Sequence, residues 1–276
     1  MSAPVPNVLT IAGSDPSGGA GLQGDLKTFA AFHVHGCAVP TALTAQNSRG
    51  VHDVFPVPAH FVRRQLDVLF DDIEIRAVKI GMLANASVVT AVGEALERWK
   101  PAYVVLDPVL SATAGGALLD TTGLEAIRRE LLPLVTLVTP NAAEAGMLLD
   151  RPAPKSPQNS ARAARDLCAA GARAALVTGG HVNTGDQCID VLYERASETA
   201  AEFRVARVNG ASAHGTGCAL SSAIAALLAR GVSLAESCEQ AQRFVAESIG
   251  ATSELQVGTG AGPLNSLHHL WRCDAE

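Results

Sequence analysis

The sequence predicts an α/β protein whose mainly parallel central sheet is covered by helices on both faces. Apolar runs of strand length alternate with longer segments of helical spacing along most of the chain, and this alternation is typical of parallel sheets connected by helices. Hydrophobic residues form 48% of the 276 residues but aromatic residues only 4%. Small side chains therefore dominate the expected core and suit close helix–sheet contacts. We expect one domain spanning residues 1–276.

The first strand and helix show the pattern most clearly. Residues 7–12 form an apolar run that ends at Gly13, and the turn-rich loop 14–21 leads to helical spacing over 22–32. The same criteria predict further strands at 37–44, 77–80, 103–106, 134–138 and 174–177. They predict further helices at 61–70, 87–99, 123–131, 142–149, 161–170, about 218–230 and 234–250.

Two stretches of the second half depart from this alternation. Residues 187–208 show shorter alternating segments, which indicate antiparallel strands. Residues 150–157 are rich in proline. We expect a surface loop there and no domain boundary, because the strand–helix pattern resumes unchanged.

Composition and charge exclude several functional classes. The net charge is −6 and no run rich in Lys or Arg occurs, so nucleic acid is not an expected partner. Every apolar stretch is interrupted well short of a membrane span, and no signal-peptide pattern is present. The six cysteines are scattered without a C-x-x-C pair, so neither a disulfide framework nor a zinc site is expected. We expect a cytoplasmic protein.

The segment 214–218 is the most informative motif. It stands directly before an expected helix, whose unpaired first-turn amides and positive dipole end favour an anion. Gly215, Thr216 and Gly217 place little side chain between those amides and a ligand. Cys218 sits where the same dipole would lower the pKa of a thiol and favour thiolate. The motif therefore predicts transfer of a phosphoryl group to a small acceptor.

Other polar residues follow the expected strands. Gln46 offers a primary amide suited to an amino group beside a ring nitrogen. Asp107 and Glu144 are candidate ligands for a hydrated Mg²⁺, and Asn141 with Glu144 also predicts a capping box. Because ligands of such sheets bind beyond the carboxyl ends of the strands, we expect these residues to meet there.

Two glycine-rich segments are expected beside this site. The loop 13–21 lacks both the Gly-Lys-Ser/Thr ending of a Walker A motif and the G-x-G-x-x-G spacing of a Rossmann loop. We interpret it as a wall over a small ligand. Thr178, Gly179 and Gly180 close another strand, and the glycines would let a nucleotide pass close to the backbone.

The ordered set of segments resembles the hydroxymethylpyrimidine/phosphomethylpyrimidine kinase family of the ribokinase-like superfamily, nearly from end to end. The segments that carry the resemblance are 11–21, 25–28, 41–47, 79–83, 106–109, 139–145 and 214–218. Related pyridoxal and hydroxyethylthiazole kinases share only parts of this set. The resemblance implies a three-layer α/β/α fold and a homodimer.

The resemblance also implies two successive ATP-dependent, Mg²⁺-supported steps that serve thiamine phosphate synthesis. The first phosphorylates the hydroxymethyl group of 4-amino-5-hydroxymethyl-2-methylpyrimidine, and the second converts the monophosphate to the pyrophosphate. Gln46 would bind the aminopyrimidine. The remaining residues implied for the substrate pocket are Gly13, Asp25, Met82 and Val109.

For the phosphate side, the resemblance implies that the amides of Gly215, Thr216 and Gly217 stabilise the transferring group. Cys218 stands where most of the superfamily has an aspartate base, and either acts as the base or positions the site. The implied nucleotide-binding residues are Asn141, Thr178 and Gly180.

Two positions depart from the family's pattern. Many relatives have lysine where this chain has Thr113, and many place lysine where it has Thr178. Each change removes a counter-charge for phosphate, which bears on nucleotide affinity and on the balance of the two steps. Composition predicts a mobile flap at 113–116.

Three alternatives stay open from the residues. A pyridoxal kinase is one, because that ring also carries a hydroxymethyl group, and a single-step pyrimidine salvage kinase is another. A catalytically silent pyrimidine-sensing module belongs to a different class. It would require a damaged phosphate cradle, whereas 215–217 are intact here.

Overall fold

The computed structural model describes residues 4–110, 118–180, 182, 184–208 and 213–271. Thr113, the flap expected at 113–116 and His181 lie outside the described residues. The strands are β1 Asn7–Ser14, β2 His35–Asn47, β3 Gly50–Pro56, β4 Ile75–Ile80, β5 Tyr103–Leu106, β6 Leu137–Val138, β7 Ala174–Val177, β8 Gln187–Glu194, β9 Thr199–Ala206, β10 Ala213–His214 and β11 Gly262–Pro263. The α-helices are α1 Gly21–Ala31, α2 Ala59–Asp72, α3 Ala86–Trp99, α4 Thr121–Ala126, α5 Ala142–Leu149, α6 Pro157–Ala169, α7 Thr216–Ala229 and α8 Leu234–Gly250.

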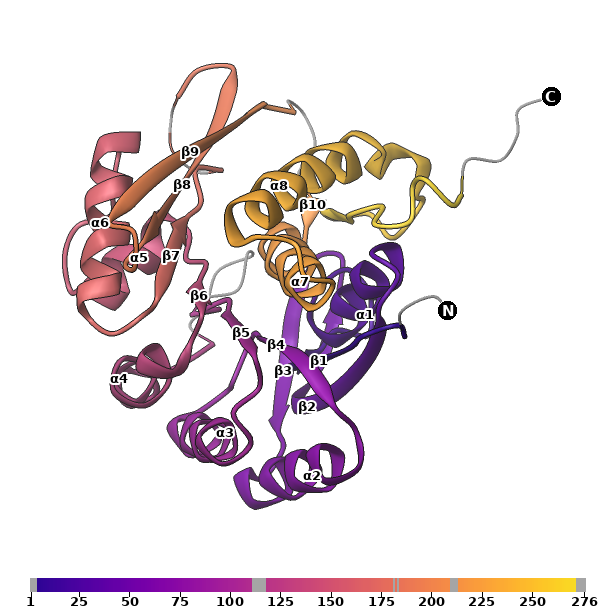
Figure 1. Ribbon diagram of the computed structural model, residues 1–276. Helices are drawn as coiled ribbons and strands as arrows, with labels where there is room; N and C mark the ends of the chain where they lie inside the picture. The colour runs from indigo at the N-terminus through magenta and orange to yellow at the C-terminus, as the bar shows by residue number, and fades with distance from the viewer. Residues whose placement is uncertain (1–3, 111–117, 181, 183, 209–212, 272–276) are drawn as a thin grey trace.

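One large sheet runs through the molecule (Figure 1). Over the described ranges it has nine strands in the order β3-β2-β1-β4-β5-β6-β7-β8-β9, with β10 and β11 paired separately. The central strands from β2 to β7 are parallel, and β3, β8 and β9 are antiparallel at the two edges. The predicted α/β fold with a mainly parallel sheet is confirmed.

Side chains that alternate along the strands fill two cores, one on each face of the sheet. On β1, Leu9 and Ile11 join a cluster with residues of α2 to α6. Val8, on the opposite face, joins a cluster with residues of α1, α7 and α8. Figure 1 shows these two helix layers on either side of the sheet. The result is the three-layer arrangement that the sequence predicts.

Several boundaries differ from the predictions. The hairpin strand β3 was not expected, because most of its side chains are exposed and no buried alternation marks it. The strand expected at 134–138 is only Leu137–Val138, since a 3₁₀ turn at Leu132–Leu134 precedes it. Helix α4 passes into a π-helical turn at Ile127–Leu131, and the loop expected through residue 157 ends at Ser156, which caps α6.

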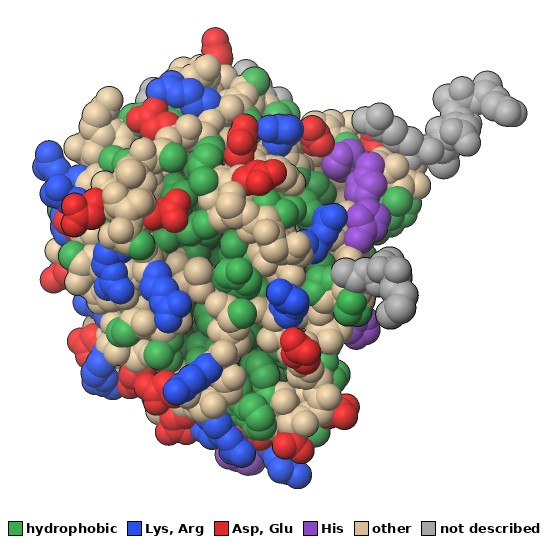
Figure 2. Space-filling model, viewed as in Figure 1, with side chains coloured by type: hydrophobic (Ala, Val, Ile, Leu, Met, Phe, Trp, Pro, Cys, Tyr) green, Lys and Arg blue, Asp and Glu red, His purple; other side chains and the backbone are tan. Residues whose placement is uncertain are grey.

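The remaining global expectations concern membranes, cysteines and charge. None of the described helices is long and apolar enough to cross a membrane. The described cysteines, at positions 37, 168, 188, 218 and 238, are all free. On the face shown in Figure 2, acidic and basic side chains are interspersed, and no broad basic surface is visible there.

Candidate active site

The predicted site residues gather at the carboxyl end of the parallel strands, as expected. Gly13 belongs to β1, Met82 follows β4, and a Cβ added to Gly13 would lie 3.0 Å from the Met82 sulfur. Asp107 follows β5, and a Cβ on Gly217 of α7 would lie 3.6 Å from its carboxylate. Val109, two residues after Asp107, stays partly exposed. Residues from four separate elements therefore surround one region.

The loop between β1 and α1 is organised by Asp15. Its carboxylate accepts hydrogen bonds from the Ser17 amide and hydroxyl at 2.8 and 2.7 Å, and from the Gly19 and Ala20 amides at 3.2 and 2.9 Å. Burial raises the pKa of Asp15, but hydrogen bonds from His214 and Ser17 outweigh burial and hold the pKa at about 2. Asp15 is therefore ionised at neutral pH and fixes the loop.

Gly215 brings that loop against the start of α7. It adopts φ 92° at the N-cap, and a Cβ there would lie 2.0 Å from the Gly19 carbonyl oxygen. Only glycine accommodates both the positive φ and the close approach. No described side chain caps α7, so the first-turn amides, including those of Thr216 and Gly217, are available to an anion.

Cys218 is not a thiolate in this environment. Burial raises the pKa of its thiol to about 12; the Lys79 ammonium lowers the pKa, whereas the Asp107 and Asp25 charges raise it. The prediction of a thiol activated by the helix dipole is therefore wrong for the free protein. Desolvation and neighbouring carboxylates exceed the effect of the helix terminus.

Asp25 lies beneath the site and does not line it. Its side chain is 0% exposed and forms an ion pair with Lys79 at 2.9 Å, also 0% exposed. Thr10 and Ser222 donate further hydrogen bonds to Asp25 at 2.5 and 2.7 Å. These partners occupy both carboxylate oxygens. Contrary to what the resemblance implies, Asp25 therefore does not line the substrate pocket but supports the residues that do.

Lys79 is a buried cation that the sequence analysis did not single out. Burial lowers its pKa, but the Asp25 charge, with Cys218 and Asp107 nearby, outweighs burial and raises it above the ordinary value. A lysine within the apolar run 77–80 was the available signal. Lys79 and Asp25 must both be present, because an unpaired charge at this depth would be costly.

Gln46 faces the same region from β2. The register shifts between Ala45 and Gln46, and this irregularity redirects the side chain. Its amide nitrogen lies 2.9 Å from His214 Nε2, which in turn lies 3.1 Å from Asp15 Oδ2. Asp15 and His214 fall within the segments 11–21 and 214–218, but the sequence predicts no individual role for either. The structure brings His214 to the Gln46 amide and Asp15 to His214.

Asp107 and Glu144 form the predicted pair of carboxylates. They are 5% and 6% exposed. Burial, followed by the Asp107 charge, raises the pKa of Glu144 to about 8. Burial also raises the pKa of Asp107, against the opposing Lys79 charge. The described residues contain no group of three or more His, Cys, Asp or Glu side chains placed to hold a metal ion, so any cation here relies on these two carboxylates and on other ligands.

The predicted capping box at α5 is confirmed. The Asn141 side chain accepts from the Glu144 amide at 3.0 Å, and Glu144 Oε2 accepts from the Asn141 amide at 2.9 Å. The Asn141 side-chain oxygen is thereby occupied, which leaves its amide group for a ligand. Asn141 also forms a β-bridge with Thr178, so these two predicted nucleotide-site residues are neighbours.

The end of β7 presents backbone to open space. A Cβ on Gly179 would lie 2.0 Å from the Ile189 carbonyl oxygen, so glycine is required there. A Cβ on Gly180 would meet nothing within 4 Å. Asp190 of β8, a residue that sequence reasoning missed, accepts from the Gly179 amide at 2.7 Å. The segment can therefore border a ligand, as predicted.

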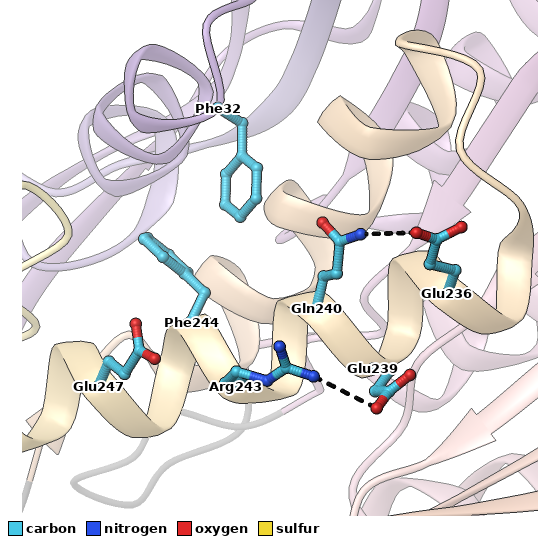
Figure 3. A pocket seen from close by; sticks show the side chains of 7 residues that line it. All are labelled: Phe32, Glu236, Glu239, Gln240, Arg243, Phe244 and Glu247. Carbon is cyan, nitrogen blue, oxygen red and sulfur yellow. Dashed lines mark hydrogen bonds and ion pairs between the residues drawn. The ribbon is translucent and has the colours of Figure 1, made fainter.

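The cavity in Figure 3 lies away from these residues. It measures about 370 Å³ and is lined by α8 side chains together with Phe32, which follows α1. Two helical pairs, Gln240–Glu236 and Arg243–Glu239, occupy its wall. Phe32 packs edge-on against Phe244, with ring centroids 4.8 Å apart. No predicted site residue lines this cavity.

The chain is similar to known proteins over nearly its whole length. Residues 15–265 match the family described as phosphomethylpyrimidine kinase. A hydroxymethylpyrimidine/phosphomethylpyrimidine kinase of Escherichia coli (strain K12) is 44% identical over 265 residues, which cover 96% of this chain and 98% of that relative.

Solved structures show the same similarity. A phosphomethylpyrimidine kinase from Clostridium difficile 630 superposes with a TM-score of 0.78 at 34% identity, covering 88% of this chain and 99% of the other. The pyridoxal kinase from Staphylococcus aureus, in complex with AMP-PCP and pyridoxal, superposes with a TM-score of 0.88 at 31% identity, covering 98% and 96%.

Proposed function

This chain belongs to the phosphomethylpyrimidine kinase family, and we propose from that premise how its site performs the reaction. It is a ribokinase-like kinase of thiamine biosynthesis, which phosphorylates 4-amino-5-hydroxymethyl-2-methylpyrimidine and then the resulting monophosphate. We propose ATP as the phosphoryl donor, since similar kinases have been solved with ADP or AMP-PCP.

The observation that carries the mechanism is the uncapped start of α7. Gly215 closes the loop from β1 over this helix terminus, and the amides of Gly215, Thr216 and Gly217 provide fixed donors for the transferring phosphoryl group. Phosphoryl transfer is largely loose, so positioned donors contribute more than activation of the hydroxyl. We therefore assign Cys218 a positioning role and no role as a thiolate base.

For the pyrimidine, we propose Gln46 as the main recognition residue. A primary amide can pair with an amino group and an adjacent ring nitrogen. His214 Nε2 lies beside the amide nitrogen of Gln46, and Asp15 lies on His214 and not on the amide. Met82 and Val109, both partly exposed next to the site, provide apolar contacts to the ring.

For the nucleotide, we propose that Asn141, Thr178 and Gly180 form part of the binding surface. The bridge between Asn141 and Thr178 places them side by side, and the space over Gly180 is open. Asp107 and Glu144 fit a hydrated Mg²⁺, since buried carboxylate oxygens are hard ligands and the remaining positions can be filled by water and phosphate. When bound, Mg²⁺ supplies positive charge that offsets the charge of the transferring phosphoryl group.

Four broader expectations remain part of this proposal. We propose a single domain over residues 1–276, supported by the one sheet that spans the described chain. We propose a homodimer in the cytoplasm, supported by the family resemblance and by a substrate and donor that are small metabolites. Neither nucleic acid nor membrane is a proposed partner.

The test is an assay of the purified protein with ATP, Mg²⁺ and the hydroxymethylpyrimidine, in which monophosphate and pyrophosphate products are separated. Both products are expected. Monophosphate alone would indicate a single-step salvage kinase, and no product would refute the proposal. The same assay with pyridoxal provides the comparison, because a similar structure holds that substrate; the expected kcat/KM is higher for the pyrimidine.

A further inference from the structure

Arg207 makes an unusual set of contacts directly after β9. Its guanidinium donates to the carbonyl oxygens of Gly180 at 2.7 Å, Val182 at 2.8 Å and Gln187 at 3.2 Å, and Nε donates to Gly185 at 3.3 Å. Three of these acceptors lie in the connection between β7 and β8, and Gln187 is the first residue of β8. One side chain therefore holds the backbone of this connection and the start of β8 at four points.

The connection would otherwise be weakly restrained. It contains Gly179, Gly180 and Gly185, and Gly185 has φ 69°. Glycine loses more backbone entropy on ordering than any other residue. The planar guanidinium has five donors in a fixed geometry, so a single group can order several carbonyls at a lower entropic cost than separate side chains could.

The same connection is anchored from its other side. The Gly179 amide donates to the buried Asp190 carboxylate at 2.7 Å, and the Asp186 carbonyl accepts from the Arg207 amide at 2.8 Å. Gly180 lies between these anchors, with open space beyond it. The backbone proposed to border the nucleotide is thus fixed by residues of β8 and by Arg207.

Arg207 also brings charge to this position. The sequence from 178 to 187 contains no Lys or Arg. Within the ranges that the structure describes, Arg207 forms no ion pair with a carboxylate. Its described side-chain hydrogen bonds all go to carbonyl oxygens, and its positive charge can act on a polyphosphate at longer range.

We propose that Arg207 is a positioning residue for the nucleotide: it fixes the Thr178–Gly180 backbone in the conformation that receives ATP. This inference rests on the nucleotide site of the proposed function. It assigns Arg207 to nucleotide affinity and not to pyrimidine recognition, which Gln46 performs from the other end of the sheet.

The experiment compares Arg207→Gln and Arg207→Lys with Arg204→Gln. Arg204 lies on β9, is exposed, and contacts the Gln187 and Glu202 side chains, so it is a matched control. Arg207→Gln is expected to raise the KM for ATP about tenfold, the scale of losing one hydrogen bond to a charged group. The KM for the pyrimidine should stay within about twofold.

The lysine variant separates charge from geometry. It keeps the charge but loses the planar set of donors, so we expect a smaller increase in the KM for ATP, about threefold. An unchanged KM for ATP in Arg207→Gln would overturn the proposal. So would an equal rise in both KM values, which would indicate general disruption, or the same effect in Arg204→Gln.

Direct binding of AMP-PCP, measured by calorimetry, makes the test independent of the acceptor substrate. Weaker AMP-PCP binding in either Arg207 variant, with Arg204→Gln unchanged, supports the proposal even if the pyrimidine is not turned over. If Arg207→Gln does not fold, Arg207→Lys must weaken AMP-PCP binding by itself. Affinity equal to that of the unmodified protein would overturn the proposal.

Discussion

At the residue scale, the centre of the molecule holds an unusual concentration of buried ionisable groups. The Asp25–Lys79 pair has no solvent exposure, and the Lys79 charge acts on both Cys218 and Asp107. Breaking a buried pair by removing one partner typically costs about 3–5 kcal/mol. Substitution of Asp25 or Lys79 would therefore mainly change the free energy of unfolding. Cys218 and Gln46, which are partly exposed, are better positions at which to test the reaction.

Replacement of Cys218 by Ala is expected to lower kcat and to leave pyrimidine binding nearly intact. The reason is positional, because the raised pKa of about 12 keeps the thiol protonated throughout the neutral range. The kcat of the unmodified enzyme should therefore show no thiol titration between about pH 7 and 9. Cys218→Ser, which is similar in size, is the matched control and should retain more activity than Cys218→Ala.

Two results would contradict a positioning role for Cys218. An inflection of kcat in that pH range that disappears in Cys218→Ala would identify a thiolate base. Equal losses of turnover and of pyrimidine affinity would show that Cys218 packs the pocket.

Replacement of Gln46 by Ala is expected to weaken pyrimidine binding by about 1–3 kcal/mol, the cost of leaving polar groups without a partner. Calorimetric titration with the hydroxymethylpyrimidine measures it. Asn47→Ala is the control, since the neighbouring Asn47 side chain accepts only a local bond from the Arg49 amide at 2.9 Å. Unchanged affinity in Gln46→Ala would remove this residue from the recognition site.

At the element scale, the start of α7 depends on two glycines for different reasons. Gly215→Ala places a methyl group against the Gly19 carbonyl at positive φ and should destabilise the protein by about 2 kcal/mol. In Gly217→Ala the added Cβ makes only ordinary contact, 3.6 Å from Asp107. That variant should keep its stability but lose roughly tenfold or more in kcat, because the methyl group crowds the phosphate donors.

Urea unfolding and kinetics of the two glycine variants provide the measurement. The free energy of unfolding should fall in Gly215→Ala. In Gly217→Ala, kcat should fall while the free energy of unfolding stays unchanged. Full activity in Gly217→Ala would show that the amides at this helix terminus do not contact the transferring group.

The connection between β7 and β8 makes a prediction about pH. Burial raises the pKa of Asp190 from its ordinary value of 3.8 to about 6, despite hydrogen bonds from Gly179 and Gln242 that lower it. The folded protein therefore binds more protons than the unfolded chain between those values, and this group makes the free energy of unfolding fall as pH rises from about 4 to about 6.

Asp190→Asn keeps an oxygen acceptor for Gly179 but cannot titrate. The free energy of unfolding of this variant minus that of the unmodified protein should be about 2 kcal/mol larger at pH 7.5 than at pH 4.5, which means that the variant gains relative stability as pH rises. Urea titrations at the two pH values measure this difference, with the exposed Asp186→Asn as the comparison variant. A difference that does not change with pH would contradict the assignment.

The elements also show where sequence patterns are sufficient. Helix α3 and strand β5 were predicted closely, because their buried positions follow the periods of a helix and a strand. Strand β3 was missed because its neighbour β2 supplies the pairing and few of its own side chains are buried. Strand β6 was predicted too long, because its length is set by the few positions at which it pairs with β5 and β7 and not by its local sequence pattern.

At the scale of the whole molecule, one sheet joins strands that lie far apart along the chain. Strands from the first and last thirds of the described sequence belong to it, and α7 packs on β1, β4 and β5. We expect one cooperative unfolding transition. The Trp271→Phe variant leaves Trp99, which stacks on Phe70 at 5.8 Å, as the remaining tryptophan, so fluorescence would report on one helix layer.

Fluorescence and far-ultraviolet circular dichroism of that variant should give coincident urea transitions. Nucleotide at 100 times its Kd should raise the free energy of unfolding by about 2.7 kcal/mol in both signals. Separate transitions would contradict the single-domain proposal.

The sequence by itself determined the fold class and the family, because both depend on periodicity and on the order of short motifs along the chain. It also placed Gly215, Thr216 and Gly217 at the start of a helix, which depends on local backbone, and their role as phosphate donors stays a prediction. Only the tertiary structure decided the protonation of Cys218, the burial of Asp25 and the partners of Arg207. Asp25 meets Lys79 across 54 positions and Ser222 across 197, and desolvation depends on all such neighbours together, which no local pattern encodes.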